Sequence, residues 1–139
     1  PKMNHLAHAW LAGPDPDVVV GSVLADFWRG APDPAWRPGV VAGVRLHRRI
    51  DAITDAHPAV AAARAYFDPG VRRWAGVALD VWFDHCLARD FERVAGEPLR
   101  GFVERVHAAL AGARLADPPA FGLFVARLAR HDGLAAYAD

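Results

Sequence analysis

Two carboxylates lie on an otherwise apolar stripe of the segment GVALDVWFDHCLARDF (76–91). At about 100° per residue, Asp80 and Asp84 share one helical face with Leu87 and Phe91. Like charges one helical turn apart repel each other, and burial adds the cost of taking both out of water. Such a pair needs protonation, a neighbouring arginine or a bound cation, so both residues are candidate metal ligands.

A second polar series runs through LHRRIDAITDAHP (46–58). His47, Asp51 and Asp55 follow one another at intervals of four and form a ridge that drifts by about 40° per step. The ridge borders an apolar face made of Leu46, Ile50 and Ile53. At the edge of a buried face, these side chains could line a cleft and bind a metal ion or move a proton. The alternative is that Asp51 and Asp55 are solvated charges paired with Arg48 and similar residues.

Other polar residues also stand in apolar surroundings. Asp26 is the only charge between Asp17 and Arg29, and it is either a further ligand or the partner of a buried arginine. His85 could reach the same point as Asp84 from the side. Two more histidines near the N-terminus are His5 and His8. Mixed histidine and aspartate ligands favour a hydrolytic Mn²⁺, Mg²⁺ or iron centre over a structural zinc site, which would favour cysteine.

These residues must be positioned by helices, because apolar positions recur at helical spacing between Gly- and Pro-rich breaks. We expect one compact all-α domain over residues 1–139, with Asp17 and Asp132 as helix N-caps. The expected helices cover 4–12, 18–28, 40–56, 59–67, 71–94, 98–112, 119–130 and 132–138. The tryptophans and phenylalanines lie at helical spacing and therefore belong to the core rather than to a base-stacking platform.

The composition narrows the classes of partner and compartment. Hydrophobic residues make up 53% of the chain, and 16 basic residues balance 16 acidic ones, which argues against disorder and against bulk attraction to nucleic acid. A single cysteine, Cys86, fits a reducing compartment, and no apolar run is long enough for a membrane span. We therefore expect a cytoplasmic protein whose natural start is Met3, residues 1–2 being a cloning remnant. The oligomeric state stays open.

Four stretches, in the order MNHLAHAWLA, GSVLADFWRG, GVRLHRRIDAITDAHP and LDVWFDHCLARDF, resemble the acyl carrier protein phosphodiesterase family. The most specific part is H-R-R-I-D-x-x-T-D followed by D-x-x-x-D-H. The resemblance implies an enzyme that hydrolyses the 4′-phosphopantetheine arm from holo-acyl carrier protein. It also implies a divalent metal, Mn²⁺ first with Mg²⁺ or Fe²⁺ as alternatives, and a helical fold related to the HD-type metal phosphohydrolases. The family usually continues through further C-terminal helices, which we expect this chain to lack.

Burial and resemblance together assign expected roles. Asp26, His47, Asp80 and Asp84 are the expected metal ligands. The residues expected to orient water or to contact phosphate in catalysis are Asp51, His85 and His8, with Asn4 and Asp55 in support. Contacts to phosphate or to the carrier protein are expected from Arg29, Arg45, Arg48 and Arg49. His5 stands where the family can carry an apolar residue, so it is left out of the expected site.

Two other functions fit the same residues. An HD-like phosphatase or nucleotide phosphodiesterase would use the same metal site on a different substrate. A non-catalytic module that binds carrier protein would use the arginines and bind no metal.

Overall fold

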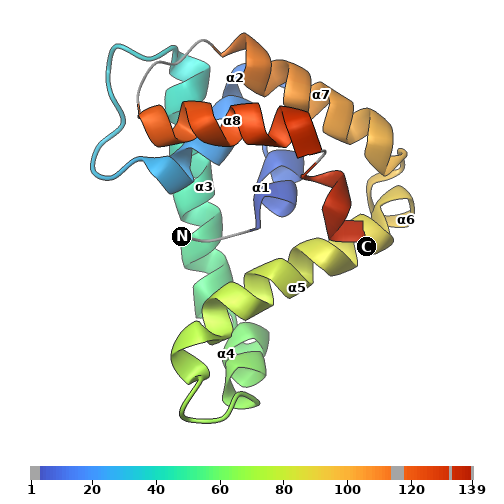
Figure 1. The fold of residues 1–139 in the computed structure, drawn as a ribbon. Helices are drawn as coiled ribbons and strands as arrows, with labels where there is room; N and C mark the ends of the chain where they lie inside the picture. The colour runs from blue at the N-terminus through green and yellow to red at the C-terminus, as the bar shows by residue number, and fades with distance from the viewer. Residues whose placement is uncertain (1–3, 114–117, 132, 139) are drawn as a thin grey trace.

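The computed structural model describes residues 4–113, 118–131 and 133–138, and within these ranges the regular structure is entirely helical (Figure 1). The α-helices are α1 (His5–Leu11), α2 (Pro16–Leu24), α3 (Pro38–Ala56), α4 (Pro58–Ala65), α5 (Ala75–Arg89), α6 (Phe91–Ala95), α7 (Leu99–Gly112) and α8 (Pro119–His131). Short 3₁₀ turns are η1 (Ala25–Phe27), η2 (Arg72–Trp74) and η3 (Ala135–Ala138). The expected all-α domain is confirmed. A relation to the HD-type fold stays a prediction.

Helices α2 and α3 form the most extensive helix pair of the described residues, and two glycines make their close crossing possible. A Cβ atom on Gly21 would overlap the carbonyl oxygen of Val40, and one on Gly43 would overlap that of Val18. Only residues without a side chain allow this approach. The crossing brings the carbonyl group of Ser22 on α2 against His47 on α3.

Helix α1 lies in the centre of the view in Figure 1, between α3 and α5. Its N-cap residue, Asn4, makes no capping hydrogen bond with its side chain. Asp84 of α5 replaces that cap, because its Oδ2 accepts from the backbone N–H of Leu6 at 2.8 Å and its Oδ1 from that of Ala7 at 2.9 Å. Helix α5 therefore satisfies two of the N–H groups that the start of every helix leaves unpaired.

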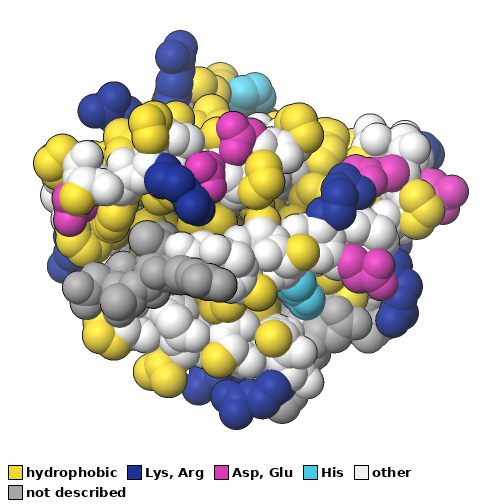
Figure 2. Space-filling model, turned by 90° about the horizontal axis from the view of Figure 1, so that it is seen from above, with side chains coloured by type: hydrophobic (Ala, Val, Ile, Leu, Met, Phe, Trp, Pro, Cys, Tyr) yellow, Lys and Arg dark blue, Asp and Glu magenta, His cyan; other side chains and the backbone are white. Residues whose placement is uncertain are grey.

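The core surrounds α1 and α2. Leu6, Val20, Leu24 and Val44 are fully buried there. Aromatic rings from η1, α6, α7 and α8 extend it: Phe91 packs against Phe102, and Phe27 against Phe121 and Phe124. Seen from above, basic, acidic and hydrophobic side chains are interspersed over the surface (Figure 2). Among the described helices, none combines the length and the apolar character that a membrane span requires.

Several expected boundaries differ from the structure. The expected helix over 71–94 is three elements, because η2 precedes α5 and the chain breaks at Asp90 before α6. The prediction of Asp17 as an N-cap is wrong: the side chain of Asp15 accepts from the N–H of Asp17, and Pro16 occupies the first helical turn. The predicted cap at Asp132 lies outside the described residues.

The apolar face expected beside the polar ridge of α3 is only partly buried. Ile53 is 61% exposed, whereas Leu46 and Ile50 are half-buried. The last turns of α3 extend beyond the core together with α4, none of whose residues is buried. The ridge therefore enters the protein interior at His47 and leaves it before Asp55.

Candidate metal centre

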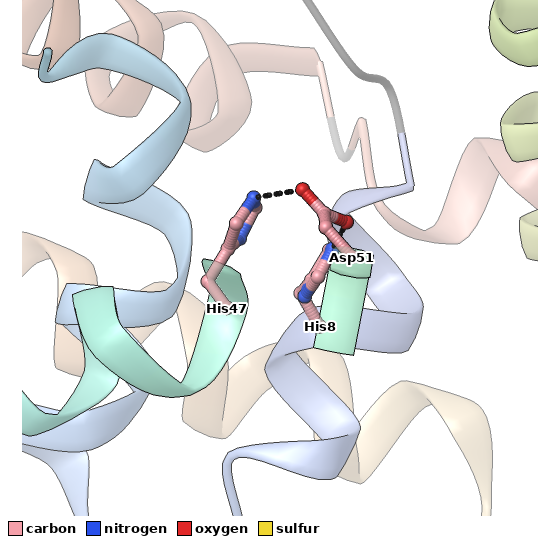
Figure 3. A group of neighbouring side chains, drawn as sticks. All are labelled: His8, His47 and Asp51. Atoms are coloured by element: carbon pink, nitrogen blue, oxygen red, sulfur yellow. Dashed lines mark hydrogen bonds and ion pairs between the residues drawn. The ribbon is translucent and has the colours of Figure 1, made fainter. Parts of the chain in front are cut away.

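His8, His47 and Asp51 bring three donor atoms to one place, all within 4.8 Å of one another (Figure 3). His8 comes from α1, and the other two come from successive turns of α3. The Nε2 atom of His8 lies 3.0 Å from Asp51 Oδ1, and the Nε2 atom of His47 lies 3.3 Å from Asp51 Oδ2. The two imidazole rings stack, with centroids 3.6 Å apart.

The helix crossing fixes which ring nitrogen of His47 carries a hydrogen. Its Nδ1 atom lies 2.6 Å from the carbonyl oxygen of Ser22, and because a carbonyl can only accept, Nδ1 carries the hydrogen and donates it. This leaves Nε2 facing two carboxylates, Asp51 on one side and Asp26 on the other, where Asp26 Oδ1 is 3.4 Å away. A histidine that donates one ring N–H to a backbone carbonyl and presents its other nitrogen to a metal is the usual arrangement of metal-ligating histidines.

Asp26, from the 3₁₀ turn η1, lies beside the donor group. It lies in η1, directly after α2, and its Oδ2 atom is 3.2 Å from Nδ1 of His5. That contact lacks the alignment of a hydrogen bond, and both atoms are buried without a hydrogen-bond partner. The Nδ1 atom of His8 and the Oδ1 atom of Asn4 are buried in the same condition. Because buried polar atoms are almost always paired, four atoms without hydrogen-bond partners on these residues fit a site that binds a ligand.

The charges of the group are strongly coupled. Burial disfavours a charged His47, but its contacts with Asp26 and Asp51 prevail and raise its pKa to about 9. Burial likewise works against the ionised form of Asp26, yet His47 and His5 lower its pKa to about 2. Burial raises the pKa of Asp51, and the contacts with His47 and His8 outweigh this and hold it far below its usual range. At neutral pH both carboxylates are therefore ionised, and the ring of His47 between them is protonated.

This donor set fits a divalent cation. Ligands about 2.1 Å from a shared cation are roughly 3.0–3.5 Å apart, and the His8–Asp51 and His47–Asp51 separations of 3.0 and 3.3 Å fall in that range. A cation would replace the proton on His47 and balance the two carboxylates. His8, His47 and Asp51 are thus the residues that could hold it, with Asp26 beside them.

The structure does not bring Asp84 into this donor group. Both of its oxygens accept backbone hydrogen bonds at the start of α1, and its side chain is fully buried. Burial raises its pKa to about 6, although the bonds from Ala7 and Leu6 oppose the rise. Asp80 is half-buried and its charge also raises the pKa of Asp84, but it too lies outside the three-residue group. Asp84 thus caps α1 in this structure, and the metal-ligand role expected of Asp80 and Asp84 stays a prediction.

Three other expected site residues have different neighbours. The Nδ1 atom of His85 donates to the carbonyl oxygen of Tyr137 at 2.8 Å and so ties η3 to α5. Asp55 is exposed and pairs with Arg64 at 3.1 Å. Arg48 donates to two backbone carbonyls of the loop that precedes α3, at 2.6 and 3.2 Å, so its guanidinium holds that loop. The remaining arginines expected to bind phosphate or partner, all exposed, are Arg29, Arg45 and Arg49.

Sequence reasoning missed two contributors to the group. The resemblance excludes His5 from the expected site, although its place three residues before His8 on one short helix is a sequence signal. The backbone carbonyl of Ser22 has no sequence signal of its own. The glycine spacing that allows the helix crossing, Gly21 and Gly43, becomes meaningful only when the two helices are seen together.

A cavity of about 630 Å³ lies elsewhere, between the α1–α2 turn and α7. Trp10, Val19 and Phe102 contribute apolar surface, and Arg37 and Arg105 also line it. These arginines already pair with carboxylates, at 2.7 Å in both cases. None of the cavity's lining residues belongs to the donor group, so the cavity is separate from the candidate centre.

Comparison with known proteins places the chain in a family. Residues 3–139 match the sequence model of the family described as acyl carrier protein phosphodiesterase. A protein of that name from Serratia proteamaculans (strain 568) is 43% identical over 122 residues, which cover 86% of this chain and 62% of that protein. Another, from Salmonella newport (strain SL254), is 43% identical over 120 residues with the same coverage. This chain thus spans 62% of the length of these curated relatives. No solved structure matches the chain. The chain belongs to the acyl carrier protein phosphodiesterase family.

Proposed function

We propose that this chain hydrolyses holo-acyl carrier protein, releasing 4′-phosphopantetheine and leaving apo-acyl carrier protein. Water adds to the phosphorus, the bond from phosphorus to the serine oxygen breaks, and that oxygen takes up a proton. The observation that carries the proposal is the buried group of His8, His47 and Asp51 in a member of this family.

A divalent cation held by these residues, Mn²⁺ by our proposal, would supply positive charge for the phosphoryl oxygens and lower the pKa of a bound water. The chain's own residues prepare that place. Ser22 fixes the tautomer of His47 through its carbonyl group, and the stacked ring of His8 restricts rotation of His47. Asp51, with 19% of its side chain exposed, is the member of the group that reaches solvent, whereas His8 and His47 are buried. We therefore place the approach of the phosphodiester at Asp51.

The substrate is a protein, and acyl carrier proteins are acidic around the serine that carries the arm. Arg45 and Arg49 are exposed on α3, the helix that carries His47 and Asp51. Exposed charges of this kind act mainly on the rate of association. We propose that they attract the carrier protein toward the centre. A cytoplasmic location for this encounter stays a prediction.

The test is conversion of holo- to apo-acyl carrier protein by the purified chain with Mn²⁺, followed by mass spectrometry. Asp51→Asn should abolish conversion, while the matched control Asp55→Asn, one turn further along α3 and exposed, should retain it. Absence of conversion by the wild-type chain with Mn²⁺, Mg²⁺ or Fe²⁺ would reject the proposal. Turnover of nucleotide phosphodiesters in place of carrier protein would support the HD-like alternative. Binding of carrier protein without hydrolysis or metal uptake would support the non-catalytic one.

A further inference from the structure

The donor atoms of the site extend further than one cation can reach. Five side chains form a continuous row of contacts: His8, Asp51, His47, Asp26 and His5, with separations of 3.0, 3.3, 3.4 and 3.2 Å. Among the described residues, only the first three of this row form a group whose donor atoms all lie within 4.8 Å of one another. A cation bound by that group therefore leaves the far end of the row, Asp26 and His5, unexplained.

The far end has the features of a binding position. His5 Nδ1 and Asp26 Oδ2 are buried, lie 3.2 Å apart and have no hydrogen-bond partner. That separation equals the edge expected between two ligands of one cation, roughly 3.0–3.5 Å. Asn4, directly before His5 in the sequence, also has a buried Oδ1 atom without a hydrogen-bond partner.

Asp26 is placed to serve two positions at once. Its Oδ1 faces Nε2 of His47, and its Oδ2 faces Nδ1 of His5. Carboxylates that present one oxygen to each of two cations occur in sites where the cations are about 3.5–4 Å apart. The ring of His5 is held for this purpose by Phe124 of α8, with ring centroids 4.8 Å apart.

We propose that His5 and Asp26 form a second divalent-cation position beside the one formed by His8, His47 and Asp51, with Asp26 bridging the two. The inference rests on the proposed metal centre and extends it. The second position has fewer charged or imidazole donors than the first, so it binds more weakly and fills at higher metal concentration. Because Asp26 is shared with the first position, the second position depends on the side chain of His5.

The experiment counts cations. The metal-free wild-type chain is titrated with Mn²⁺ by calorimetry, and Mn²⁺ electron paramagnetic resonance reports whether bound ions are magnetically coupled. We expect two Mn²⁺ per chain with a coupled signal for the wild type. His5→Phe, which keeps a ring against Phe124, should bind one Mn²⁺ with an uncoupled signal. The matched control is His107→Phe on α7, another histidine with a buried, unpartnered ring nitrogen, and it should still bind two.

A wild-type chain that binds one Mn²⁺, or a His5→Phe chain that still binds two, would overturn the inference. His5→Gln serves as a second variant, and circular dichroism without metal confirms that both variants are folded. Failure of this inference is distinguishable from failure of the proposed function. One Mn²⁺ with intact hydrolysis of holo-acyl carrier protein rejects only the second position. Two Mn²⁺ ions that fall to one in His5→Phe, without hydrolysis in the wild type, reject only the function.

Discussion

Replacing Asp84 with asparagine separates the role of a helix cap from that of a metal ligand. The carboxylate is fully buried and accepts from the N–H groups of Leu6 and Ala7, while burial raises its pKa from 3.8 to about 6. A group whose pKa is higher in the folded state favours folding when protonated. Its contribution is fully present below pH 3.8 and is lost as the pH rises through 6.

The size of this loss follows from the pKa difference. At about 1.4 kcal/mol per pKa unit, the change from 3.8 to about 6 corresponds to about 3 kcal/mol, most of it between pH 4 and pH 7. Asparagine does not ionise, so Asp84→Asn should lack this dependence. Relative to the wild type, the free energy of unfolding of the variant should be lowest at pH 4, where a protonated Asp84 carries no charge penalty. Between pH 4 and pH 7 the difference should shift by about 2 kcal/mol in favour of the variant.

The assay is urea unfolding of both metal-free proteins at several pH values, followed by circular dichroism. A difference in unfolding free energy between the two proteins that stays constant from pH 4 to pH 7 would show that the pKa of Asp84 is not raised in the folded state. Mn²⁺ binding adds a second readout. Because both oxygens of Asp84 accept hydrogen bonds from α1, Asp84→Asn should still bind Mn²⁺. A loss of binding comparable to that of Asp51→Asn would identify Asp84 as a metal ligand.

Three further outcomes follow from the geometry. Gly43→Ala should destabilise the protein by about 1–3 kcal/mol in thermal unfolding and weaken Mn²⁺ binding, because the new Cβ pushes α2 away from α3, whereas Gly122→Ala, with open space around it, should be neutral or slightly stabilising. Mn²⁺ affinity, measured by competition with a chelator, should fall about tenfold for each pH unit below 8, because the His47 proton, with a pKa of about 9, must leave before the metal binds; an affinity that does not vary with pH would contradict this. Replacing Arg45 and Arg49 together with alanine should raise KM for holo-acyl carrier protein and flatten its salt dependence, while hydrolysis of bis-p-nitrophenyl phosphate changes little; an equal loss on both substrates would place these arginines in the metal site or the fold.

Sequence patterns predicted the helical elements well because helical spacing is a local property. Burial of Asp84 was also predictable, since its helical face is apolar. Its role as a cap was not, because the N–H groups that it caps belong to α1, 78 and 77 residues earlier in the sequence. The break at Asp90 was missed for a related reason: no Gly or Pro marks it, and Phe91, the first residue of α6, packs into the core.

The site was predicted in part. Periodicity identified the ridge of α3, and Asp26 stood out as a charge in an apolar run. Which carboxylate meets which histidine depends on the crossing of α2 and α3 and on the depth of α1, both tertiary properties. Asp51, expected as a catalytic residue, lies among the three grouped donors, and His5 joins the row although the resemblance gives no reason to include it.

The central claim is that His8, His47 and Asp51 hold the catalytic cation, and its most direct test is a crystal of the chain grown with Mn²⁺. Anomalous diffraction collected above and below the manganese absorption edge locates the ion independently of any kinetic assay. We expect a manganese peak bounded by Nε2 of His8, Nε2 of His47 and the carboxylate of Asp51. A peak beside Asp80 and Asp84, or no peak in crystals that contain active protein, would contradict it.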